Sequence, residues 1–206
     1  MNTYPFLIGV AGSSGSGKSE LASQLAKTLN APIVSLDSYY LDLKHLSYEE
    51  RCKVNFDEPA SLESALLIDH FSKIARGEAV EVPEYDFSVH TRTARTTRIV
   101  PGKYIILEGL FALYWENLRN VLGIGVFVEL PDDVCFARRL ERDIRERGRT
   151  PESVREQYDS TVKPMGELYI LPTRAHADVI VRGDARIEDS VATVLEHCAQ
   201  MRAVSA

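Results

Sequence analysis

The sequence predicts an α/β fold in which helices flank a largely parallel sheet. Short apolar runs alternate with segments whose apolar residues recur at helical spacing. This alternation is typical of strands joined by crossover helices, and such connections make the strands parallel. The runs expected to form the core strands are Phe6–Ala11, Ile33–Leu36, Tyr104–Glu108, Gly125–Leu130 and Ala177–Val181. In open sheets of this kind, ligands bind beyond the carboxyl ends of the strands.

Length and composition describe an ordinary globular chain. The 206 residues, 45% hydrophobic and 26% charged, are most simply one domain spanning residues 1–206. We expect no membrane segment, because no apolar run reaches bilayer length. The net charge of −6 argues against broad nucleic-acid binding. Cys52, Cys135 and Cys198 form neither a metal-binding spacing nor a paired framework, which favours a reducing, cytoplasmic location.

A glycine-rich segment follows the first predicted strand. Residues 12–19, GSSGSGKS, match G-x-x-x-x-G-K-[ST] and precede a helical pattern of Leu21, Leu25 and Leu29. Strand, glycine loop and helix form a phosphate cradle in P-loop NTPases, because the backbone N–H groups and the helix N-terminus face the phosphates. The alternative is a flexible Gly/Ser turn with a surface lysine. The residues expected to bind a nucleoside triphosphate are Gly12, Ser13, Gly15, Ser16, Gly17, Lys18 and Ser19.

Lys18 and the side chains around it define the expected chemistry. In such loops the lysine reaches the β- and γ-phosphates and the Ser19 hydroxyl binds Mg²⁺. Asp37 ends the second predicted strand, where a carboxylate can act as general base and lie near Mg²⁺; the other interpretation is a helix cap. Glu108 ends the most apolar strand, in a position where an acid holds Mg²⁺ directly or through water.

Residues 80–100 change to a β pattern, Val80–Phe87 and Thr96–Val100 around a polar turn. This predicts a hairpin that stands off the main sheet and serves as a substrate-binding flap. The alternative is a peripheral hairpin with a small satellite core. Further helices are expected over Leu62–Ile74, Leu110–Leu118, Glu152–Pro164 and Ile187–Met201.

A helix rich in arginine follows the fourth core strand. Arg138, Arg142, Arg145 and Arg149 are spaced 4, 3 and 4, which predicts one shared face. The plainer interpretation is a solvated face with ion pairs to neighbouring acids. Gly148 lies between Arg147 and Arg149 and is expected to break the helix there. This break instead favours a mobile helical lid over residues 138–163 that closes over phosphates, because guanidinium groups match phosphate oxygens.

The remaining choice is among classes of phosphate-loop protein. The Asn-Lys-x-Asp segment expected of a guanine-specific switch is absent from the sequence. A small-molecule kinase needs a base, an acceptor pocket and a lid that excludes water. Asp37, the region from Asn55 to His90 and the arginine helix are candidates for these three parts.

Several short blocks together resemble the uridine–cytidine kinase family over about residues 6–200. Each block is weak alone, but their order is highly specific. The blocks are Leu36–Tyr40, Asn55–Pro59, Tyr85–His90, Glu108–Gly109, Arg142–Arg149, Gln157–Tyr158, Val162–Pro164 and Ala177–Ile180.

This resemblance implies a pyrimidine-salvage enzyme that phosphorylates the 5′-hydroxyl of uridine or cytidine, with ATP or GTP as donor and with Mg²⁺. It implies a catalytic base at Asp37, lid arginines at Arg142, Arg147 and Arg149, and Glu108 near the metal. Arg142 is expected to act in catalysis with Lys18, and Arg149 near the nucleoside. The other implied nucleoside contacts are Tyr40, Phe56, Asp57, Tyr85, Phe87, His90, Arg139 and Gln157. A homo-oligomer, namely a tetramer, is also implied.

Three positions depart from the family pattern. Val128-Glu129-Leu130 replaces a pair such as Asp-Thr, Arg174 replaces a common lysine, and Val89 precedes His90 where Ser or Thr is usual. Two alternatives to a uridine–cytidine kinase also stay open at this point. One is a related kinase for another small alcohol, similar to phosphoribulokinase or pantothenate kinase; the other is a nucleotide-binding regulator without acceptor chemistry.

Overall fold

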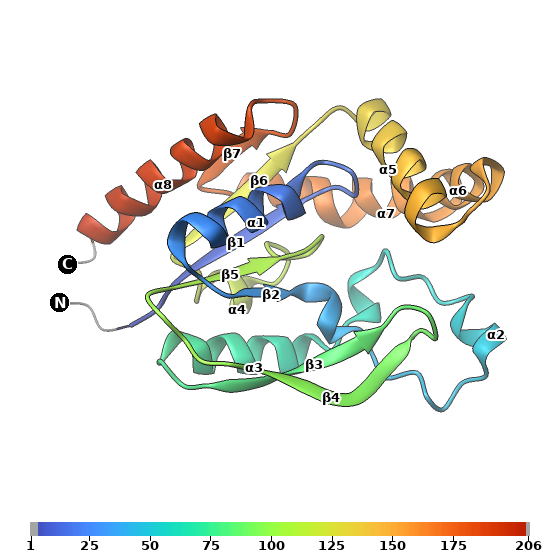
Figure 1. Ribbon diagram of the computed structural model, residues 1–206, viewed down its shortest axis with the longest axis horizontal. Helices are drawn as coiled ribbons and strands as arrows, with labels where there is room; N and C mark the ends of the chain where they lie inside the picture. Colours follow the sequence, from blue (N-terminus) through green and yellow to red (C-terminus); the bar gives the residue numbers. More distant parts are fainter. Residues whose placement is uncertain (1–3, 205–206) are drawn as a thin grey trace.

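A computed structural model describes residues 4–204, so the first three and last two residues of the expected 1–206 unit lie outside the described residues. Its centre is a parallel sheet in the order β2-β5-β1-β6-β7. The strands are β1 (Phe6–Gly12), β2 (Ile33–Ser35), β5 (Tyr104–Glu108), β6 (Ile124–Glu129) and β7 (Val179–Arg182). The predicted helix-flanked parallel sheet is therefore confirmed (Figure 1).

Side chains that alternate along the strands build two cores, one on each face of the sheet. Ile8 and Ile106 pack beneath α1 (Lys18–Leu29) and α8 (Ile187–Val204). Leu7 and Phe127 face the opposite layer, which contains α3 (Ser64–Ala75) and the segment after β5. The two helical layers enclose the sheet, whose edge strands are β2 and β7.

The predicted hairpin consists of β3 (Val80–Asp86) and β4 (Thr91–Ile99), which pair antiparallel as a separate two-stranded sheet. The base of the hairpin does not form a separate satellite core. Val80, Val82 and Ile99 are buried in the same core as α3 and the main sheet, while the tip extends beyond the carboxyl ends of the parallel strands (Figure 1).

The arginine-rich helix α5 (Asp132–Arg147) ends where Gly148 adopts a left-handed conformation, as its sequence predicts. The helix expected to stop at Pro164 does not stop there. From α6 (Pro151–Gln157) the chain continues through wide turns at Tyr158–Val162, α7 (Lys163–Met165), Gly166–Ile170 and a 3₁₀ segment to His176. The wider i→i+5 turns before Pro164 make room for a ring that would clash with the carbonyl four residues earlier in a regular α-helix.

The helix predicted over Leu110–Leu118 is also mostly wrong. Turns follow β5, and only α4 (Glu116–Arg119) is helical. The Arg119 guanidinium donates hydrogen bonds to the carbonyls of Leu113 and Tyr114, at 2.9 and 2.7 Å. In a continuous helix these two carbonyls would accept backbone N–H groups. Here the Arg119 side chain is their partner instead.

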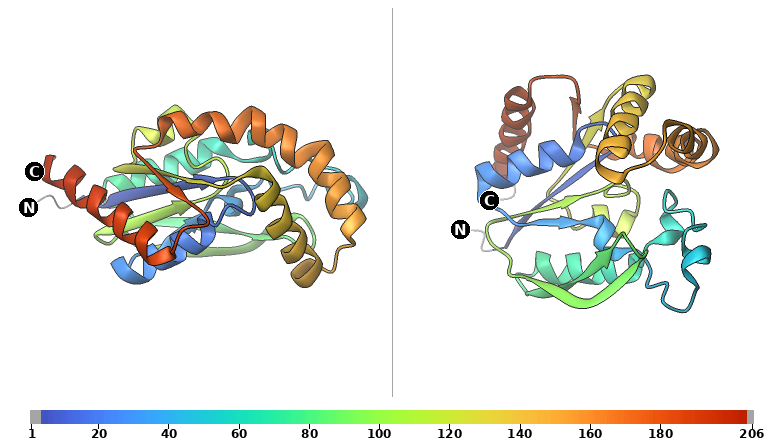
Figure 2. Two further views of the ribbon diagram at one scale, coloured as in Figure 1. Left: turned by 90° about the horizontal axis from the view of Figure 1, so that it is seen from above. Right: turned by 45° about the vertical axis from the view of Figure 1, so that its right-hand side comes forward.

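One end of the molecule collects the elements that carry the candidate site. The hairpin tip, the segment with α2 (Tyr48–Arg51), and α5 with α6 all lie beyond the carboxyl ends of the strands (Figures 1 and 2). At the far end, Arg202 of α8 lies over the rings of Phe6 and Tyr104, 5.7 and 5.2 Å from the ring centroids. Within residues 4–204, no helix combines the length and apolarity needed to cross a membrane.

Candidate active site

The glycine loop is pressed against the first turn of α5. Gly15 has φ +86°, and a Cβ there would lie 2.3 Å from the carbonyl oxygen of Cys135. Gly17 has φ +99° and immediately precedes α1. Both positions therefore require glycine, and the loop can approach α5 and start the helix without strain. This geometry supports the expected phosphate cradle at the N-terminus of α1.

Lys18, Ser19 and Glu108 meet at the carboxyl ends of β1 and β5. The Ser19 hydroxyl donates a 2.8 Å hydrogen bond to Glu108 Oε1, and Lys18 Nζ lies 3.8 Å from the same oxygen. A hydroxyl and a carboxylate are hard oxygen ligands of the kind that Mg²⁺ accepts alongside water and phosphate. Among the described residues, no group of three His, Cys, Asp or Glu side chains could hold a metal alone. Phosphate oxygens and water would complete the shell.

Asp37 lies in a 3₁₀ turn, Leu36–Tyr39, directly after β2. Ser35 caps this turn by accepting a hydrogen bond from the Asp37 N–H at 3.3 Å, so the capping role suggested for Asp37 belongs to Ser35. Burial and the nearby Glu108 raise the Asp37 pKa to about 6, although Lys18 and Arg147 act to lower it. A carboxylate with a pKa near neutral accepts a proton more readily than an ordinary aspartate.

An aromatic cluster borders the Asp37 turn. Tyr40 follows the turn, and its ring centroid lies 5.1 Å from Phe56, 5.3 Å from Tyr85 and 6.4 Å from Phe87. The Tyr40 hydroxyl donates to the Phe56 carbonyl at 3.1 Å. The four rings predicted from distant sequence blocks therefore form one cluster, in which Phe87 is exposed. Flat rings in this arrangement suit a planar ligand.

His90 lies at the hairpin tip between two rings. Its imidazole stacks on Phe56 at 5.2 Å and on Tyr48 of α2 at 6.4 Å. Arg51 donates to the Val89 carbonyl at 2.7 Å and thereby ties α2 to the tip. Burial, with a smaller contribution from Arg51, lowers the His90 pKa. The neutral ring carries one donor and one acceptor nitrogen, which can read a polar base edge.

Asp57, Arg139 and Gln157 come together between the glycine loop and α6. The buried Arg139 donates to Ser14 Oγ at 3.0 Å and to Gln157 Oε1 at 3.1 Å. Burial raises the Asp57 pKa, and Arg139 opposes this shift. The three side chains present charge and hydrogen-bonding groups beside the glycine loop. Their role as ribose contacts, which the family resemblance implies, stays a prediction.

Asp143 was missed by the sequence analysis, yet it organises the arginines. Its fully buried carboxylate accepts hydrogen bonds from Arg142 Nε and Nη2, at 3.0 and 2.8 Å. Arg139, Arg147 and Arg149 pair with it at 3.7, 3.4 and 3.7 Å. The sequence carries a signal for this cluster, because arginines lie four residues before Asp143, one residue before it and four residues after it. On a helix, residues four apart lie on the same face.

The prediction that Arg138, Arg142, Arg145 and Arg149 share one face is therefore wrong. Arg145 pairs with Glu141 and Glu146 at the surface, and Arg138 donates to the Gly183 carbonyl at 3.0 Å. Gly148 ends α5, so Arg149 folds back toward Asp143 and also donates to the Gln157 side chain. The interpretation as a face with surface ion pairs is correct for Arg145, whereas the mobile lid stays a prediction.

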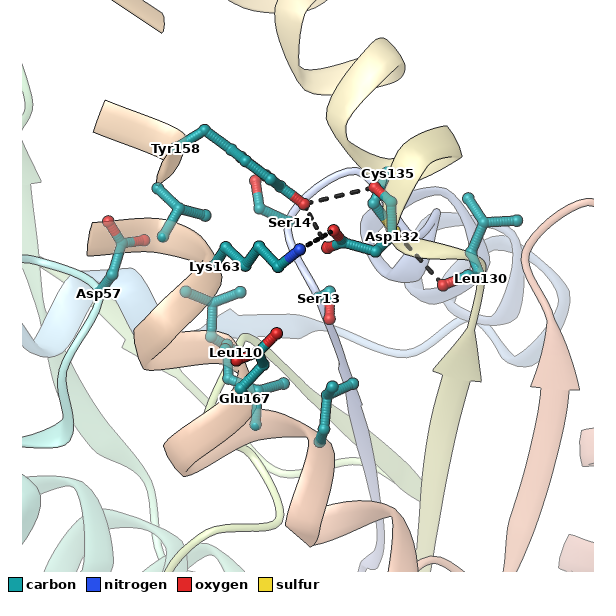
Figure 3. A pocket seen from close by; sticks show the side chains of 14 residues that line it. Ser13, Ser14, Asp57, Leu110, Leu130, Asp132, Cys135, Tyr158, Lys163 and Glu167 are labelled. Carbon is teal, nitrogen blue, oxygen red and sulfur yellow. Dashed lines mark hydrogen bonds and ion pairs between the residues drawn. The ribbon is translucent and has the colours of Figure 1, made fainter. Parts of the chain in front are cut away.

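A cavity of about 150 Å³ lies beside the glycine loop (Figure 3). Lys163 Nζ and the Tyr158 hydroxyl both point toward Asp132, at 3.4 and 2.5 Å. Ser13, Ser14 and Asp57 also line the cavity, so it is continuous with the polar group around Arg139.

Comparison with known proteins places the chain in a family. Residues 7–187 match the family model described as Phosphoribulokinase / Uridine kinase family. The chain belongs to this family. Its relatives include a uridine kinase of Vibrio parahaemolyticus, 43% identical over 97% of both chains, and one of Aliivibrio fischeri, 45% identical over 87% of both. The resemblance found in the sequence is thus confirmed.

Two solved structures share the architecture of this chain. A putative fructose transport system kinase from Silicibacter sp. matches with a TM-score of 0.72 and 22% identity, over 86% of this chain and 90% of that one. Phosphoribulokinase from Rhodobacter spheroides matches with a TM-score of 0.66 and 15% identity, over 88% of this chain and 71% of that one. At these identities the matches concern the fold alone.

Two of the three departures from the family pattern are in contact. Arg174 Nε donates to Glu129 Oε1 at 2.8 Å and joins the end of β6 to the 3₁₀ segment. The third, Val89, is exposed, and its carbonyl holds Arg51 beside the His90 ring.

Proposed function

We propose that the protein transfers the γ-phosphate of ATP to the 5′-hydroxyl of uridine or cytidine and forms UMP or CMP in pyrimidine salvage. The observation that carries this proposal is nearly full-length similarity to relatives named uridine kinase. The aromatic cluster and His90 beside the Asp37 turn support it, because they provide a place for a pyrimidine near a base and a phosphate loop.

The proposed mechanism uses Asp37 as general base. Its carboxylate takes the proton of the nucleoside hydroxyl while the oxygen attacks the γ-phosphorus and the β–γ bridging oxygen leaves with ADP. Lys18 and the lid arginines Arg142 and Arg147 bind the phosphate oxygens and stabilise the negative charge of the transition state. Ser19 and Glu108 would hold Mg²⁺, which would supply further charge neutralisation.

Nucleoside selection is assigned to the hairpin side of the site. The rings of Tyr40, Phe56, Tyr85 and Phe87 hold the base, and His90 reads its polar edge. Asp57, Arg139, Arg149 and Gln157 contact the ribose side of the nucleoside. A deoxyribose would leave some of these buried polar groups unpaired, which gives strong rejection.

The base assignment is tested with Asp37→Asn. We expect loss of turnover by about a thousandfold or more, with ATP affinity retained, because an amide cannot accept the proton. Asp69→Asn is the control, since the exposed Asp69 carboxylate pairs with Lys73 on the surface of α3 and its loss should leave turnover unchanged. Product formation is followed by chromatography, and turnover of the Asp37→Asn protein at the normal rate would exclude this role.

The nucleoside pocket is tested with His90→Asn. Asparagine tolerates the left-handed backbone of His90, φ 52°, so the change removes the ring without adding backbone strain. We expect the KM for uridine to rise at least about tenfold, with the KM for ATP unchanged. Equal changes in both values would remove His90 from the nucleoside pocket.

A panel of donors and acceptors separates the remaining candidates. The family description also names phosphoribulokinase, so ribulose 5-phosphate belongs in the panel beside uridine, cytidine, deoxyuridine and pantothenate. ATP and GTP are compared as donors. Phosphorylation of a non-nucleoside alcohol alone would favour the alternative kinase, and nucleotide binding without any product would favour a regulator.

We further propose a cytoplasmic homotetramer, on the basis of the family resemblance. Light scattering of the purified protein tests the assembly, and a monomer at micromolar concentration would contradict it.

A further inference from the structure

Arg92 differs from the other arginines of the hairpin. It lies on β4 opposite Tyr85, and its side chain is only 14% exposed. The Arg95 and Arg98 side chains on the same strand are 79% and 69% exposed, and their ion partners Glu84 and Glu81 lie on β3 of the same hairpin. Arg92 instead turns away from the hairpin toward the body of the protein.

The Arg92 guanidinium makes two contacts there. Nη1 pairs with Glu63 Oε2 at 2.5 Å, just before α3, and Nη2 donates to the Tyr39 carbonyl at 3.1 Å. The same carbonyl accepts the Glu63 N–H at 2.8 Å. One planar side chain therefore joins the hairpin, the N-terminus of α3 and the last residue of the 3₁₀ turn.

This turn is the segment that holds Asp37. Tyr39 is fully buried, and its hydroxyl forms a 3.0 Å hydrogen bond with Nδ1 of His70 on α3. The Tyr40 N–H donates to the Asp37 carbonyl at 3.4 Å. The turn is thus fixed from α3 through the Tyr39 ring, and from the hairpin through Arg92 at the Tyr39 carbonyl.

We propose that Arg92 is a positioning residue that sets the distance between the nucleoside pocket of the hairpin and the carboxylate of Asp37. The inference rests on the proposed function for its kinetic consequence. Tyr85, Phe87 and His90 hold the nucleoside from the hairpin, whereas Asp37 belongs to the sheet side. Arg92 is a direct polar bridge between these two halves of the acceptor site.

The bridge matters because proton transfer depends on short, aligned contacts. Without Arg92, the Tyr39 carbonyl keeps one donor, and Glu63 loses its charged partner. The hairpin can then shift relative to the turn by a fraction of an ångström, and misplacement of about 1 Å costs about a hundredfold in rate. Neither nucleotide binding at the glycine loop nor the lid arginines depend on this bridge.

The test compares Arg92→Ala, Arg92→Lys and Arg95→Ala. Arg95 is the matched control, because it lies on the same strand and has the same charge but does not contact the turn. For Arg92→Ala we expect kcat with uridine to fall about 30-fold, with the KM for ATP within about twofold of the unchanged protein. Arg92→Lys should recover part of kcat, since an ammonium group can neutralise Glu63 but lacks the two-pronged fork.

Amide hydrogen exchange of residues 36–41 provides a readout that needs no substrate. We expect exchange there to accelerate at least about tenfold in the Arg92→Ala protein and to stay unchanged in the Arg95→Ala protein. If Arg92→Ala does not fold, Arg92→Lys carries both measurements. Unchanged exchange, or faster exchange with undiminished kcat, overturns the inference.

Failure of the proposed function gives a different pattern. In that case the unchanged protein forms no uridine or cytidine monophosphate, while the exchange comparison still reports whether Arg92 fixes the turn. A loss of kcat shared equally by the Arg92→Ala and Arg95→Ala proteins would show an effect of hairpin charge and would also overturn the positioning role.

Discussion

At the scale of single residues, the candidate site contains buried polar groups that lower the stability of the ligand-free protein. Asp37 shares its surroundings with another acid, Glu108, and burial disfavours its charged form. The Tyr85 hydroxyl is buried without a hydrogen-bond partner among residues 4–204. Such groups cost free energy in the ligand-free protein, and a bound substrate can supply the missing interactions.

The raised pKa of Asp37 predicts a pH-dependent cost. An acid whose pKa rises from 3.8 when unfolded to about 6 when folded favours the folded state below pH 4. That contribution is lost as the pH rises from about 4 through 6. Asp37→Asn should therefore stabilise the protein by about 1–3 kcal/mol at pH 8, and by little at pH 4.

Urea unfolding without nucleotide or Mg²⁺ measures this difference. The inactive Asp37→Asn protein would then be more stable than the active one. An equal change in stability at both pH values would contradict the assignment of the shift to Asp37.

Because the Tyr85 hydroxyl lacks a hydrogen-bond partner among residues 4–204, its removal should affect nucleoside binding but should not lower the stability of the fold. Tyr85→Phe keeps the ring contacts with Tyr40 and Phe56, and should leave the free energy of unfolding unchanged or raise it by about 1 kcal/mol. The KM for uridine should rise, because a hydroxyl available to the base is lost. Destabilisation by more than about 1 kcal/mol would show that the hydroxyl has a structural partner.

At the scale of elements, the sequence predicts best where local rules decide the outcome. The core strands, the glycine loop and the end of α5 at Gly148 follow from apolar runs and backbone requirements. The arginine cluster does not, because helical spacing cannot show that Arg149 folds back past Gly148 to Asp143. The segment after Glu108 also escapes prediction, since its pattern of apolar residues gives no sign that Arg119 occupies two of its carbonyls.

For the candidate site, the sequence predicted most of the residues but not the contacts that join them. Each expected ring of the aromatic cluster was named from a short block, and the structure brings those rings together. Asp143 and Arg92 were not named, since their importance lies in contacts with several elements.

The arginine cluster predicts a large energetic difference between two acids of one helix. Asp143→Asn removes the buried charge that offsets four guanidinium groups, and should destabilise the protein by about 3 kcal/mol or more. Glu141→Gln breaks an exposed pair with Arg145 and should cost less than about 1 kcal/mol. Urea unfolding of both variants provides the comparison, and similar costs would refute the role of Asp143 as the shared partner.

At the scale of the whole molecule, the hairpin shares a core with the main sheet. We therefore propose that the chain unfolds as one domain, with the hairpin base part of the cooperative unit. Trp115 is the single tryptophan and packs against this core, so its fluorescence reports the sheet side. Fluorescence and far-ultraviolet circular dichroism should give the same unfolding midpoint.

Ile99→Ala tests this shared core from the hairpin. Ile99 is 8% exposed, and its truncation should lower the free energy of unfolding by about 2–4 kcal/mol for the whole chain. Val100→Ala is the control, because the Val100 side chain next to it is 64% exposed. Two separate transitions after Ile99→Ala would show that the hairpin is an independent unit.

The close packing of the glycine loop on Cys135 gives the protein an internal chemical reporter. Cys52 is exposed, whereas burial raises the pKa of the Cys135 and Cys198 thiols to about 11. Alkylating reagents should therefore label Cys52 first. Cys135 should be labelled only when the loop separates from α5, and Cys198 when α8 leaves the sheet. The relative labelling of the three thiols, read by mass spectrometry, would distinguish opening of the nucleotide end from unfolding of the opposite end.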